Sequence, residues 1–264
     1  MDIILAGPGR AGCSLAIRMI EAGHALVGVL ARSESATPLE APRLDWDRPL
    51  PAADLLLIAV RDDAIAEVAA RLAPHSGPVD AAVHLSGLAS TAILEPLGTR
   101  IGSFHPLQTL PTPELGAARL EGAWIAVTTD DGALEERLGE LAISIGARPF
   151  TLADGAKKLY HAAAAAAANF PLGALSMAGR LFEAAGVPFD AAAPLVEAVV
   201  ANAFAIGPEA ALTGPIARGD VGTVAAQLEA VARATPELVE DFKAFGRAVA
   251  RVAGRRDEFE ALLG

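Results

Sequence analysis

The sequence predicts an α/β protein: an N-terminal Rossmann domain with a mostly parallel sheet, then an all-helical domain. Three observations support this prediction. Short apolar segments alternate with helical patterns over residues 1–152, which is typical of a parallel sheet with helices on both faces. A glycine-rich loop follows the first apolar segment. Strand patterns disappear after Gly155, so we expect a dinucleotide-binding domain at 1–152 and a helical domain at 153–264.

Each element of the first domain is predicted from its apolar pattern and the residues that bracket it. The segment 2–6 is apolar and stops at the glycine loop, and Gly23 is a C-terminal stop signal for the helix that follows the loop. The segment 55–60 is continuously apolar, as in a strand covered on both faces. Residues 34–53 are rich in proline, so we expect a loop around a possible short strand. The expected strands are 2–6, 25–30, 55–60, 81–85, 101–104, 124–128 and 148–152, and the expected helices are 11–21, 64–72 and 134–145.

The second domain is predicted to contain helices only. Helical patterns cover 156–185, 189–206, 221–234 and 236–253, and glycines such as Gly186 and Gly207 separate them. The most apolar stretch, Ala162 to Met177, contains Asn169 and Pro171 and is built largely of alanine. A membrane span needs about 20 strongly apolar residues, so we expect a buried helix here and no membrane partner.

Composition restricts the class of protein further. The 264-residue chain is 53% hydrophobic, which permits a sizeable core, and its net charge of −11 argues against binding of nucleic acid. Cys13 is the only cysteine, which excludes an intramolecular disulfide and a multi-cysteine metal site. We expect no metal site. No secretory signal stands out at the N-terminus, and a single cysteine fits the reducing cytoplasm, where we expect the protein.

The glycine-rich loop is the first motif that indicates chemistry. Gly7-Pro8-Gly9-Arg10-Ala11-Gly12 matches G-x-G-x-x-G between a strand and a helix, which is the context that the dinucleotide-binding motif requires. In that motif the first glycine permits a tight turn, the second lets the backbone approach a pyrophosphate, and the third allows close packing of helix and strand. The helix N-terminus then offers N–H groups to the phosphates.

The end of the second strand indicates which dinucleotide binds. NAD sites usually have an acidic residue there for the ribose, whereas an arginine accommodates the 2′-phosphate of NADP. This strand ends in Arg32-Ser33, with no acid before Glu34. A guanidinium and a hydroxyl suit a phosphate, so the sequence predicts NADP(H).

Polar residues also follow three other strands, at the sheet edge where ligands of open α/β sheets bind. After the strand at 55–60, the backbone at Ala59 and Val60 is expected near the nicotinamide ribose, while Asp62 or Asp63 is expected to cap the next helix. Ser86 and Gly87 follow another strand and are expected to contact substrate. His105 lies in a third such segment, either as a site residue or as part of a structural turn.

The first helix of the second domain carries a group of polar residues on an alanine-rich background. Lys157 and His161 are four residues apart and therefore share a helix face, and Asn169 follows. Polar groups on an apolar helix need partners or a purpose, so these three are candidate catalytic residues. Either Lys157 or His161 would transfer the proton, while Asn169 and His105 would orient substrate. Tyr160, the only tyrosine, is expected to pack with its hydroxyl at the rim.

A last polar concentration runs from Thr213 to Asp220. Gly214-Pro215 favours a turn, and Asp220 is suited to cap the next helix. Thr213 and Arg218 are candidate substrate contacts, because a guanidinium can bind a carboxylate with two hydrogen bonds. Arg218 can equally pair with an acid such as Asp220.

Together these motifs carry a resemblance to a known family. The glycine loop, His84-Leu85-Ser86-Gly87, His105-Pro106-Leu107-Gln108-Thr109 and Thr213-Gly214-Pro215-Ile216-Ala217-Arg218-Gly219-Asp220 occur in this order. In this respect the chain resembles bacterial Rossmann-like proteins whose second domain is a domain of unknown function of the DUF2520 type. These proteins are similar to pyrroline-5-carboxylate reductase, deazaflavin-dependent NADP reductases and the 6-phosphogluconate dehydrogenase group.

The resemblance implies a helical C-terminal domain like that of 6-phosphogluconate dehydrogenase, and a homodimer formed through its helices. In the β-hydroxyacid dehydrogenases a lysine and an asparagine stand four residues apart on the first helix after the sheet. Lys157 matches the lysine in placement, but His161 stands where the asparagine would be.

We therefore expect an NADP-dependent oxidoreductase that transfers a hydride between NADP(H) and a small carbonyl or imine, or in reverse from a hydroxy or amino compound. One alternative is a protein that binds NADP(H) on the same scaffold without catalysis. Another is a methyltransferase, which Arg32 disfavours because such enzymes usually place an acid at that strand end. The sequence does not identify the substrate.

Overall fold

The computed structural model describes residues 1–32 and 39–264, so Ser33, expected near the cofactor, lies outside the described residues. The chain divides into two compact units, Met1–Ala165 and Ala166–Gly264. The boundary expected from the sequence was 152/153. The first unit extends beyond it because Lys157 and Tyr160, at the start of the next helix, contact residues of the sheet.

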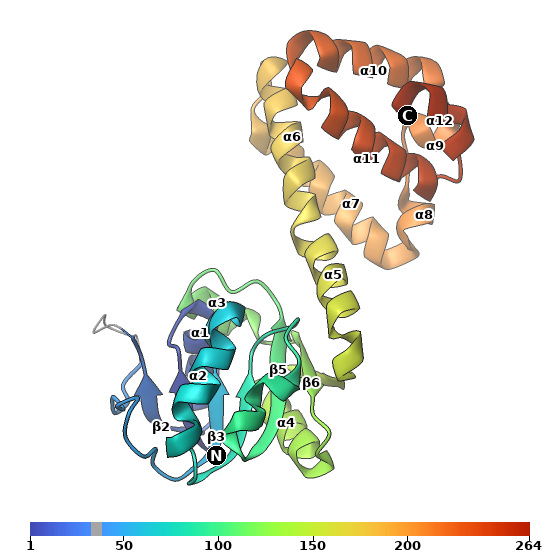
Figure 1. Cartoon of the computed structure of the whole chain (residues 1–264). Helices are drawn as coiled ribbons and strands as arrows, with labels where there is room; N and C mark the ends of the chain where they lie inside the picture. Colours follow the sequence, from blue (N-terminus) through green and yellow to red (C-terminus); the bar gives the residue numbers. More distant parts are fainter. Residues whose placement is uncertain (33–38) are drawn as a thin grey trace. The chain divides into compact units, whose positions relative to one another are not determined.

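The first unit is built around a sheet whose strand order is β2-β1-β3-β4-β5-β6-β7 in the described part of the chain (Figure 1). All neighbouring strands are parallel except β5 and β6, which are antiparallel. The expected mostly parallel sheet is therefore confirmed. The strands are β1 (Asp2–Ala6), β2 (Ala25–Leu30), β3 (Ala53–Ile58), β4 (Val79–His84), β5 (Arg100–Leu107), β6 (Trp124–Thr128) and β7 (Arg148–Thr151).

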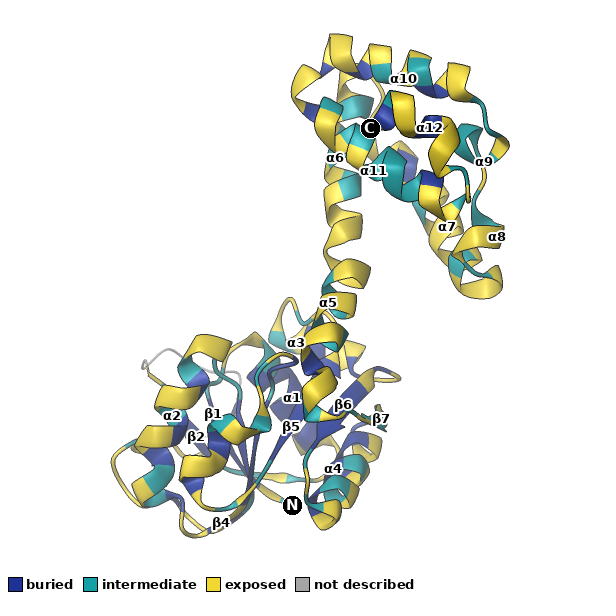
Figure 2. Ribbon diagram, turned by 45° about the vertical axis from the view of Figure 1, so that its right-hand side comes forward, coloured by how far each residue is buried: buried dark blue, intermediate teal, exposed yellow. Residues whose placement is uncertain are grey.

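Helices pack on both faces of this sheet, because alternate strand residues point to opposite sides. Ile3 and Leu5 of β1 belong to a core cluster with residues of α1 and α4, whereas Ile4 and Ala6 belong to a second cluster with α2 and η3. Figure 2 shows this buried layer at the centre of the unit. The helices are α1 (Arg10–Glu21), α2 (Ile65–Leu72), α3 (Pro113–Arg119) and α4 (Gly132–Ser144), with the 3-10 segments η1 (Asp62–Ala64), η2 (Ala73–His75), η3 (Thr91–Leu97) and η4 (Asp154–Ala156).

Two short helical segments, η3 and α3, were not expected from the sequence. Each begins at a hydroxyl cap: Ser90 accepts a hydrogen bond from the Ala92 N–H, and Thr112 accepts one from the Leu115 N–H. With seven residues each, they are too short to show a clear helical period. Between β2 and β3, the described residues 39–52 form no strand, but a single parallel bridge joins Arg43 to Val29.

The second unit is helical, as expected. A small core formed by Val224, Ala250, Phe259 and Leu263 joins α10, α11 and α12. The short helices α8, α9 and α12 were not expected. The helices that belong wholly or partly to this unit are α5 (Lys157–Ala168), α6 (Phe170–Ala184), α7 (Ala193–Ile206), α8 (Pro208–Ala211), α9 (Pro215–Arg218), α10 (Val221–Ala234), α11 (Val239–Val252) and α12 (Arg256–Leu263), with η5 (Phe189–Ala192) and η6 (Pro236–Leu238) between them.

The expectation that Ala162 to Met177 forms a buried helix is wrong. No residue in this stretch is buried, and the regular helix is interrupted at Asn169, two residues before Pro171 (Figure 2). By length and composition alone, the stretches Asp154–Ala184 and Phe189–Ile206 are apolar enough to cross a membrane. Helices that pack at protein interfaces meet the same criteria, so this finding alone assigns no membrane.

Candidate active site

The glycine loop joins β1 to α1 in the manner that the motif requires. Gly7 has a φ of +91°, and a Cβ added there would lie 2.7 Å from Val60 Cγ1. A Cβ added at Gly12 would lie 2.6 Å from the carbonyl oxygen of Gly7. By contrast, a Cβ at Gly9 would meet nothing within 4 Å. Gly7 and Gly12 thus allow the close packing of loop, helix and β3, while the backbone at Gly9 is open to a ligand.

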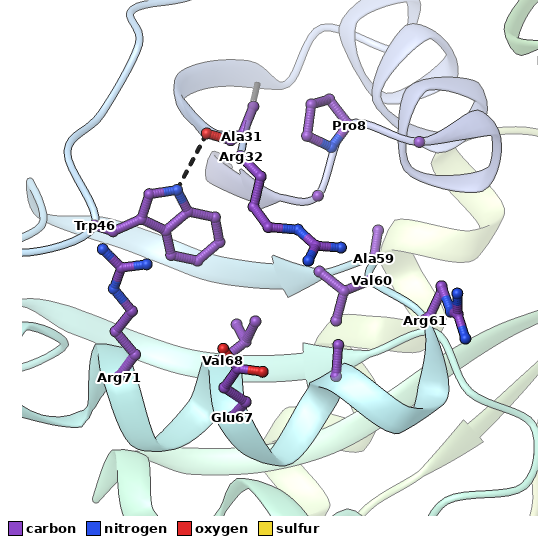
Figure 3. Close-up of a pocket in the computed structure, with 13 residues that line it drawn as sticks. Pro8, Ala31, Arg32, Trp46, Ala59, Val60, Arg61, Glu67, Val68 and Arg71 are labelled. Atoms are coloured by element: carbon purple, nitrogen blue, oxygen red, sulfur yellow. Dashed lines mark hydrogen bonds between the residues drawn. The ribbon is translucent and has the colours of Figure 1, made fainter. Parts of the chain in front are cut away.

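A pocket of about 300 Å³ opens beside this loop (Figure 3). The glycine loop, the end of β2, the residues after β3 and one side of α2 line it. Its apolar wall includes Val60 and Val68, and Trp46 lines it from a turn in the segment between β2 and β3. Of the residues expected to bind cofactor, Gly7, Pro8, Gly9, Arg32, Ala59 and Val60 line this pocket, whereas Arg10, Ala11 and Gly12 form the first turn of α1.

Trp46 and Arg71 were not singled out in the sequence, yet they form one side of the pocket. The Trp46 indole N–H donates a hydrogen bond to the carbonyl oxygen of Ala31, 3.2 Å away, at the end of β2. The Arg71 guanidinium lies 5.5 Å from the Trp46 ring centroid and makes two hydrogen bonds to the Asp47 carboxylate. The ring is therefore held from two sides, although the sequence around it showed only a proline-rich loop.

Three guanidinium groups line the pocket, but their charges are not equally available. Arg61 is paired with Asp63 at 2.7 Å, and Arg71 with Asp47 at 2.8 Å. Within the described residues, Arg32 has no ion-pair partner, and its side chain extends over the pocket in Figure 3. An anionic group in the pocket would therefore be attracted most strongly by Arg32.

A buried polar network lies at the ends of β4 and β5. Lys157, the first residue of α5, is only 1% exposed. Its Nζ donates hydrogen bonds to the Ser86 carbonyl oxygen at 3.0 Å and to Ser103 Oγ at 2.6 Å. Burial lowers the pKa of Lys157 to about 8, although Asp154 and Asp62 act in the opposite direction.

Ser86 is the centre of this network. Its hydroxyl donates to Asp62 at 2.6 Å and accepts from the N–H groups of Leu88 and Ala89 at 3.1 and 2.9 Å. One donor and two lone pairs are then all in use, so the hydroxyl has no capacity left for substrate. The expected helix-capping role of Asp62 and Asp63 is wrong, because η1 has no side-chain cap: Asp62 accepts from Ser86, and Asp63 pairs with Arg61.

His84 was quoted only as part of a motif, but it shapes the same turn. The Ser86 N–H donates a hydrogen bond of 3.1 Å to His84 Nδ1, which therefore carries no proton. Burial, together with the nearby charge of Lys157, lowers the pKa of His84 to about 4. A neutral imidazole thus fixes the backbone at Ser86, whose carbonyl faces Lys157.

His105 lies next to this network and contacts Tyr160 of α5. His105 Nδ1 and the Tyr160 hydroxyl are 2.8 Å apart, and the two rings meet edge to face. Burial, with contributions from Lys157 and His161, lowers the pKa of His105 to about 4, and burial raises the pKa of Tyr160 to about 12. A Cβ added at Gly87 would lie 2.8 Å from both Nε2 and Cε1 of His105, so glycine allows this turn to pack closely against the ring.

The remaining candidates are distributed over both units. His161 is half-buried on α5 in the first unit. Asn169 is exposed between α5 and α6, Thr213 lies two residues before α9, and Arg218 is the last residue of α9 in the second unit. Asp220 caps α10 by accepting a hydrogen bond from the Thr223 N–H at 3.0 Å, as expected. The first unit thus brings Ser86, Gly87, His105 and Lys157 together, and it adds His84, Ser103 and Tyr160.

Fold and site together define a Rossmann-type protein with an open pocket at the glycine loop and a buried polar network at the ends of two other strands. Residues 1–111 match the model of the Rossmann-like domain, and residues 123–249 match the domain of unknown function DUF2520. The two matches follow one another along the chain, in agreement with the resemblance seen in its motifs. The search among curated proteins gives no match.

Solved structures share this fold over nearly the whole chain. A protein from Bacteroides fragilis, provisionally assigned as an NADP oxidoreductase, has a TM-score of 0.79 and 22% identity over 95% of this chain and 98% of its own. An imine reductase from Streptomyces aurantiacus has a TM-score of 0.68 and 18% identity over 100% of both chains. A reductive aminase from Aspergillus terreus, in complex with NADPH, has a TM-score of 0.61 and 18% identity over 98% of this chain and 99% of its own. At these identities the comparisons show a common fold.

Proposed function

We propose that the protein is an NADP(H)-dependent oxidoreductase that transfers a hydride between NADP(H) and a small carbonyl or imine, or in reverse from a hydroxy or amino compound. The observation that carries the proposal is the pocket at the glycine loop, in which Arg32 is the guanidinium without an ion-pair partner among the described residues. Two structural relatives, an imine reductase and a reductive aminase in complex with NADPH, support the same class of reaction.

The residues of the pocket suit the parts of this cofactor. The open backbone at Gly9 and the N–H groups of the first turn of α1 would hold the pyrophosphate. The adenine ring would lie against Trp46 and Val68, where an aromatic wall meets an apolar one. Arg32 would bind the 2′-phosphate, and Ser33 remains the second proposed contact. When bound, the cofactor supplies or accepts the hydride.

For the substrate, we assign different roles to Lys157, His105 and His161, which all lie in the first unit. Lys157 is 1% exposed and bound to Ser86 and Ser103, so it positions the ends of β4 and β5 rather than touching substrate. His105 is half-buried and adjoins Gly87, so it is the group available to a carbonyl or imine. His161 is a second candidate for proton transfer. Asn169, Thr213 and Arg218 are proposed to contribute substrate contacts from the helical unit.

A fluorescence titration tests the cofactor assignment, because Trp46 lines the pocket and Trp124 does not. In a Trp124→Phe variant, Trp46 is the remaining tryptophan. We expect NADPH to change its emission and to raise the melting temperature, with NADH at least about tenfold weaker and S-adenosylmethionine without effect. Trp46→Phe in the wild-type background should abolish the signal. Unchanged emission and melting temperature with NADPH would contradict the proposed function.

We also propose that the chain forms a homodimer through its helical unit. Seven large apolar side chains on α6 and α7, here called the apolar face, are at least half exposed: Phe170, Leu172, Leu195, Val199, Val200, Phe204 and Ile206. Soluble monomers rarely expose an apolar patch of more than a few hundred Å². Within the described residues, the main contacts of α7 are with its sequence neighbours η5 and α8, so much of it is left uncovered.

A second copy suits the apolar face better than a lipid bilayer does. The stretches Asp154–Ala184 and Phe189–Ile206 are long enough to cross a membrane, so the choice depends on the charged residues that they contain. Arg180 and Glu183 lie on α6, and Glu197 lies within α7. Charged residues at these positions are tolerated at the polar rim of a protein interface but are costly in the interior of a membrane.

A further inference from the structure

We propose that Tyr160 donates a hydrogen bond to Nδ1 of His105 and thereby fixes His105 as a neutral hydrogen-bond donor, through Nε2–H, to the oxygen or nitrogen of the substrate. The inference rests on the proposed function, because it takes the substrate to be a carbonyl or imine. His105 would be the residue that touches substrate, and Tyr160 would be its positioning residue and proton source.

The pair lies where β5 extends beyond the parallel part of the sheet. β4 and β5 are paired up to His84 and Ser103, whereas His105 is paired only with Ala126 of β6. Among the described strands, none pairs with His105 on the side of β5 that faces β4, and the turn at Gly87 packs against its ring there. This is the sheet edge where ligands of such folds bind. His105 and Tyr160 are both half-buried there, in contrast to Lys157.

The chemistry of the two groups sets the direction of their hydrogen bond. A histidine with a pKa of about 4 is neutral at pH 7, and a tyrosine with a pKa of about 12 keeps its proton. A neutral imidazole has one nitrogen that accepts and one that donates, and its unprotonated nitrogen is a better acceptor than a phenol oxygen. Because Nδ1 is the atom that lies 2.8 Å from the Tyr160 hydroxyl, Nδ1 accepts and the ring proton stays on Nε2.

Gly87 fixes the position of the His105 ring. A side chain at this position would place its Cβ 2.8 Å from both Nε2 and Cε1 and 3.1 Å from Cδ2 of His105, which is against the face of the ring. The turn that holds Gly87 is fixed through Ser86 by Asp62, His84 and Lys157. The buried network thus supports the ring through this turn, and Nε2–H, which lies in the plane of the ring, points past Gly87.

The proton transfer balances as follows for a carbonyl substrate. The bound cofactor would supply the hydride for the carbonyl carbon and would itself be oxidised, while the carbonyl oxygen takes the Nε2 proton of His105. Nδ1 takes the hydroxyl proton of Tyr160, which leaves a phenolate. When the product has left, the Nδ1 proton returns to the phenolate and Nε2 takes a proton from solvent, which restores the starting tautomer. One hydride and one proton are added to the substrate, and the transfer is favourable because an alkoxide is more basic than a phenolate.

Nitrogen NMR of the full-length protein tests the proposal without any substrate. The chain has five histidines, which can be labelled with ¹⁵N and assigned by single substitutions. At pH 7 we expect His105 as the Nε2–H tautomer, unchanged from pH 5.5 to 8. Tyr160→Phe keeps the ring but removes the donor, so the His105 tautomer should become mixed. His84 is the internal control, because the Ser86 N–H fixes its tautomer independently of Tyr160.

Two results would overturn the proposal: an Nδ1–H or charged His105 in the wild type at pH 7, or a His105 tautomer that Tyr160→Phe leaves unchanged. As a control, Trp124→Phe alters the neighbouring Trp124–Phe150 ring contact and should not change the His105 signal. NADPH binding is measured in the same samples. Absent NADPH binding with the expected tautomer would refute the proposed function and leave the tautomer assignment standing.

A kinetic arm uses NADPH with cyclohexanone or 2-methyl-1-pyrroline as probe, whichever the wild type reduces. We expect Tyr160→Phe to lower kcat about 100-fold with KM within about threefold, since its proton is needed in the transition state. Equal kcat in Tyr160→Phe and wild type would also overturn the proposal. If the wild type reduces neither probe, the tautomer measurement decides.

Discussion

The two units of the chain differ in how completely they bury their apolar side chains. The first unit sandwiches a seven-stranded sheet between helices, and several of its strand residues, such as Ile4, Leu56 and Ile58, have no exposed surface. The second unit has a small core around Phe259, while Phe204 on α7 is 90% exposed. The first unit therefore buries its apolar side chains more completely, whereas the second leaves apolar helix surface exposed.

The same contrast applies to polar groups. In the first unit Lys157, His84, Ser86 and Ser103 are buried, and each has a hydrogen bond within the unit. Among the buried residues of the second unit, Thr235 is the polar one, and its hydroxyl bonds to the carbonyl of Val231. Buried polar networks cost free energy unless they are satisfied, so their concentration in one unit marks where precise geometry is needed. Three substitutions and one pH dependence test this difference between the two units, and they follow in order of decreasing expected effect.

The largest effect is expected from Lys157→Met, which removes the donor that joins Ser86 to Ser103. We expect turnover to fall below detection, because a shift of about 1 Å at the ends of β4 and β5 costs about 100-fold or more in rate. NADPH binding, measured through Trp46 emission, should change little. The matched control is Lys158→Met at the exposed neighbouring position. Turnover close to that of the wild type in Lys157→Met would contradict a role for this network.

A charge placed on the apolar face should dissociate the proposed dimer. Phe204 is 90% exposed, so Phe204→Glu disturbs no packing within the chain, and it should weaken association by about 100-fold because a charge becomes buried without a partner. Light scattering coupled to size exclusion measures the mass. Ile143→Glu, at a 64% exposed position of the first unit, is the control and should remain dimeric. A wild type that is monomeric at micromolar concentration refutes the homodimer.

A smaller effect is expected when the free charge of the pocket is reversed. Arg32→Asp should weaken NADPH binding by about 10- to 100-fold, since a charge-assisted bond to phosphate is lost and a carboxylate repels it. NADH binding should change about threefold at most. Arg48→Asp, an exposed arginine that does not line the pocket, controls for net charge. Equal losses for the two cofactors would show that Arg32 does not bind the 2′-phosphate.

The smallest expected effect is the pH dependence of stability in the first unit. The pKa of His84 is about 4 in the folded protein against an ordinary value of 6.5, so the unfolded chain binds a proton first as the pH falls. Its contribution to stability is complete above pH 6.5 and is lost towards pH 4, at about 1 kcal/mol per pH unit. Urea titrations followed by tryptophan emission should show a shallower loss for His84→Gln than for the wild type. Identical slopes would show that His84 is not held neutral.

The fold could be predicted from the sequence because its strands and helices coincide with strong local residue patterns. The strands Asp2–Ala6, Ala25–Leu30 and Trp124–Thr128 were expected with the bounds that the structure has. Such strands can be predicted because each is a run of apolar residues bracketed by glycines or charged residues. The burial of Ala162–Met177 was predicted wrongly, because an apolar helix pattern does not show whether side chains of the same chain cover the helix.

The candidate site could be predicted only in part from the sequence, because it depends on which strand ends lie next to each other in the fold. His105, Lys157 and Ser86 stood out as polar residues at strand or helix ends, but Ser103 lies inside a strand pattern and becomes a partner of Lys157 only through the pairing of β4 with β5. Trp46 lies in a segment without period, and its approach to β2 depends on a single bridge, Val29 to Arg43. Such contacts join distant parts of the sequence and leave no local signal.

The buried thiol of Cys13, behind the glycine loop, can be used to measure the opening of that loop. Cys13 is 1% exposed, and its Sγ donates to the carbonyl oxygen of Pro8 at 3.3 Å. Burial raises the pKa of this thiol, so it resists alkylation while the loop is closed over it. Because no second cysteine competes, the rate of modification by a thiol reagent measures how often that loop opens, and a nucleotide seated on the loop should slow the reaction.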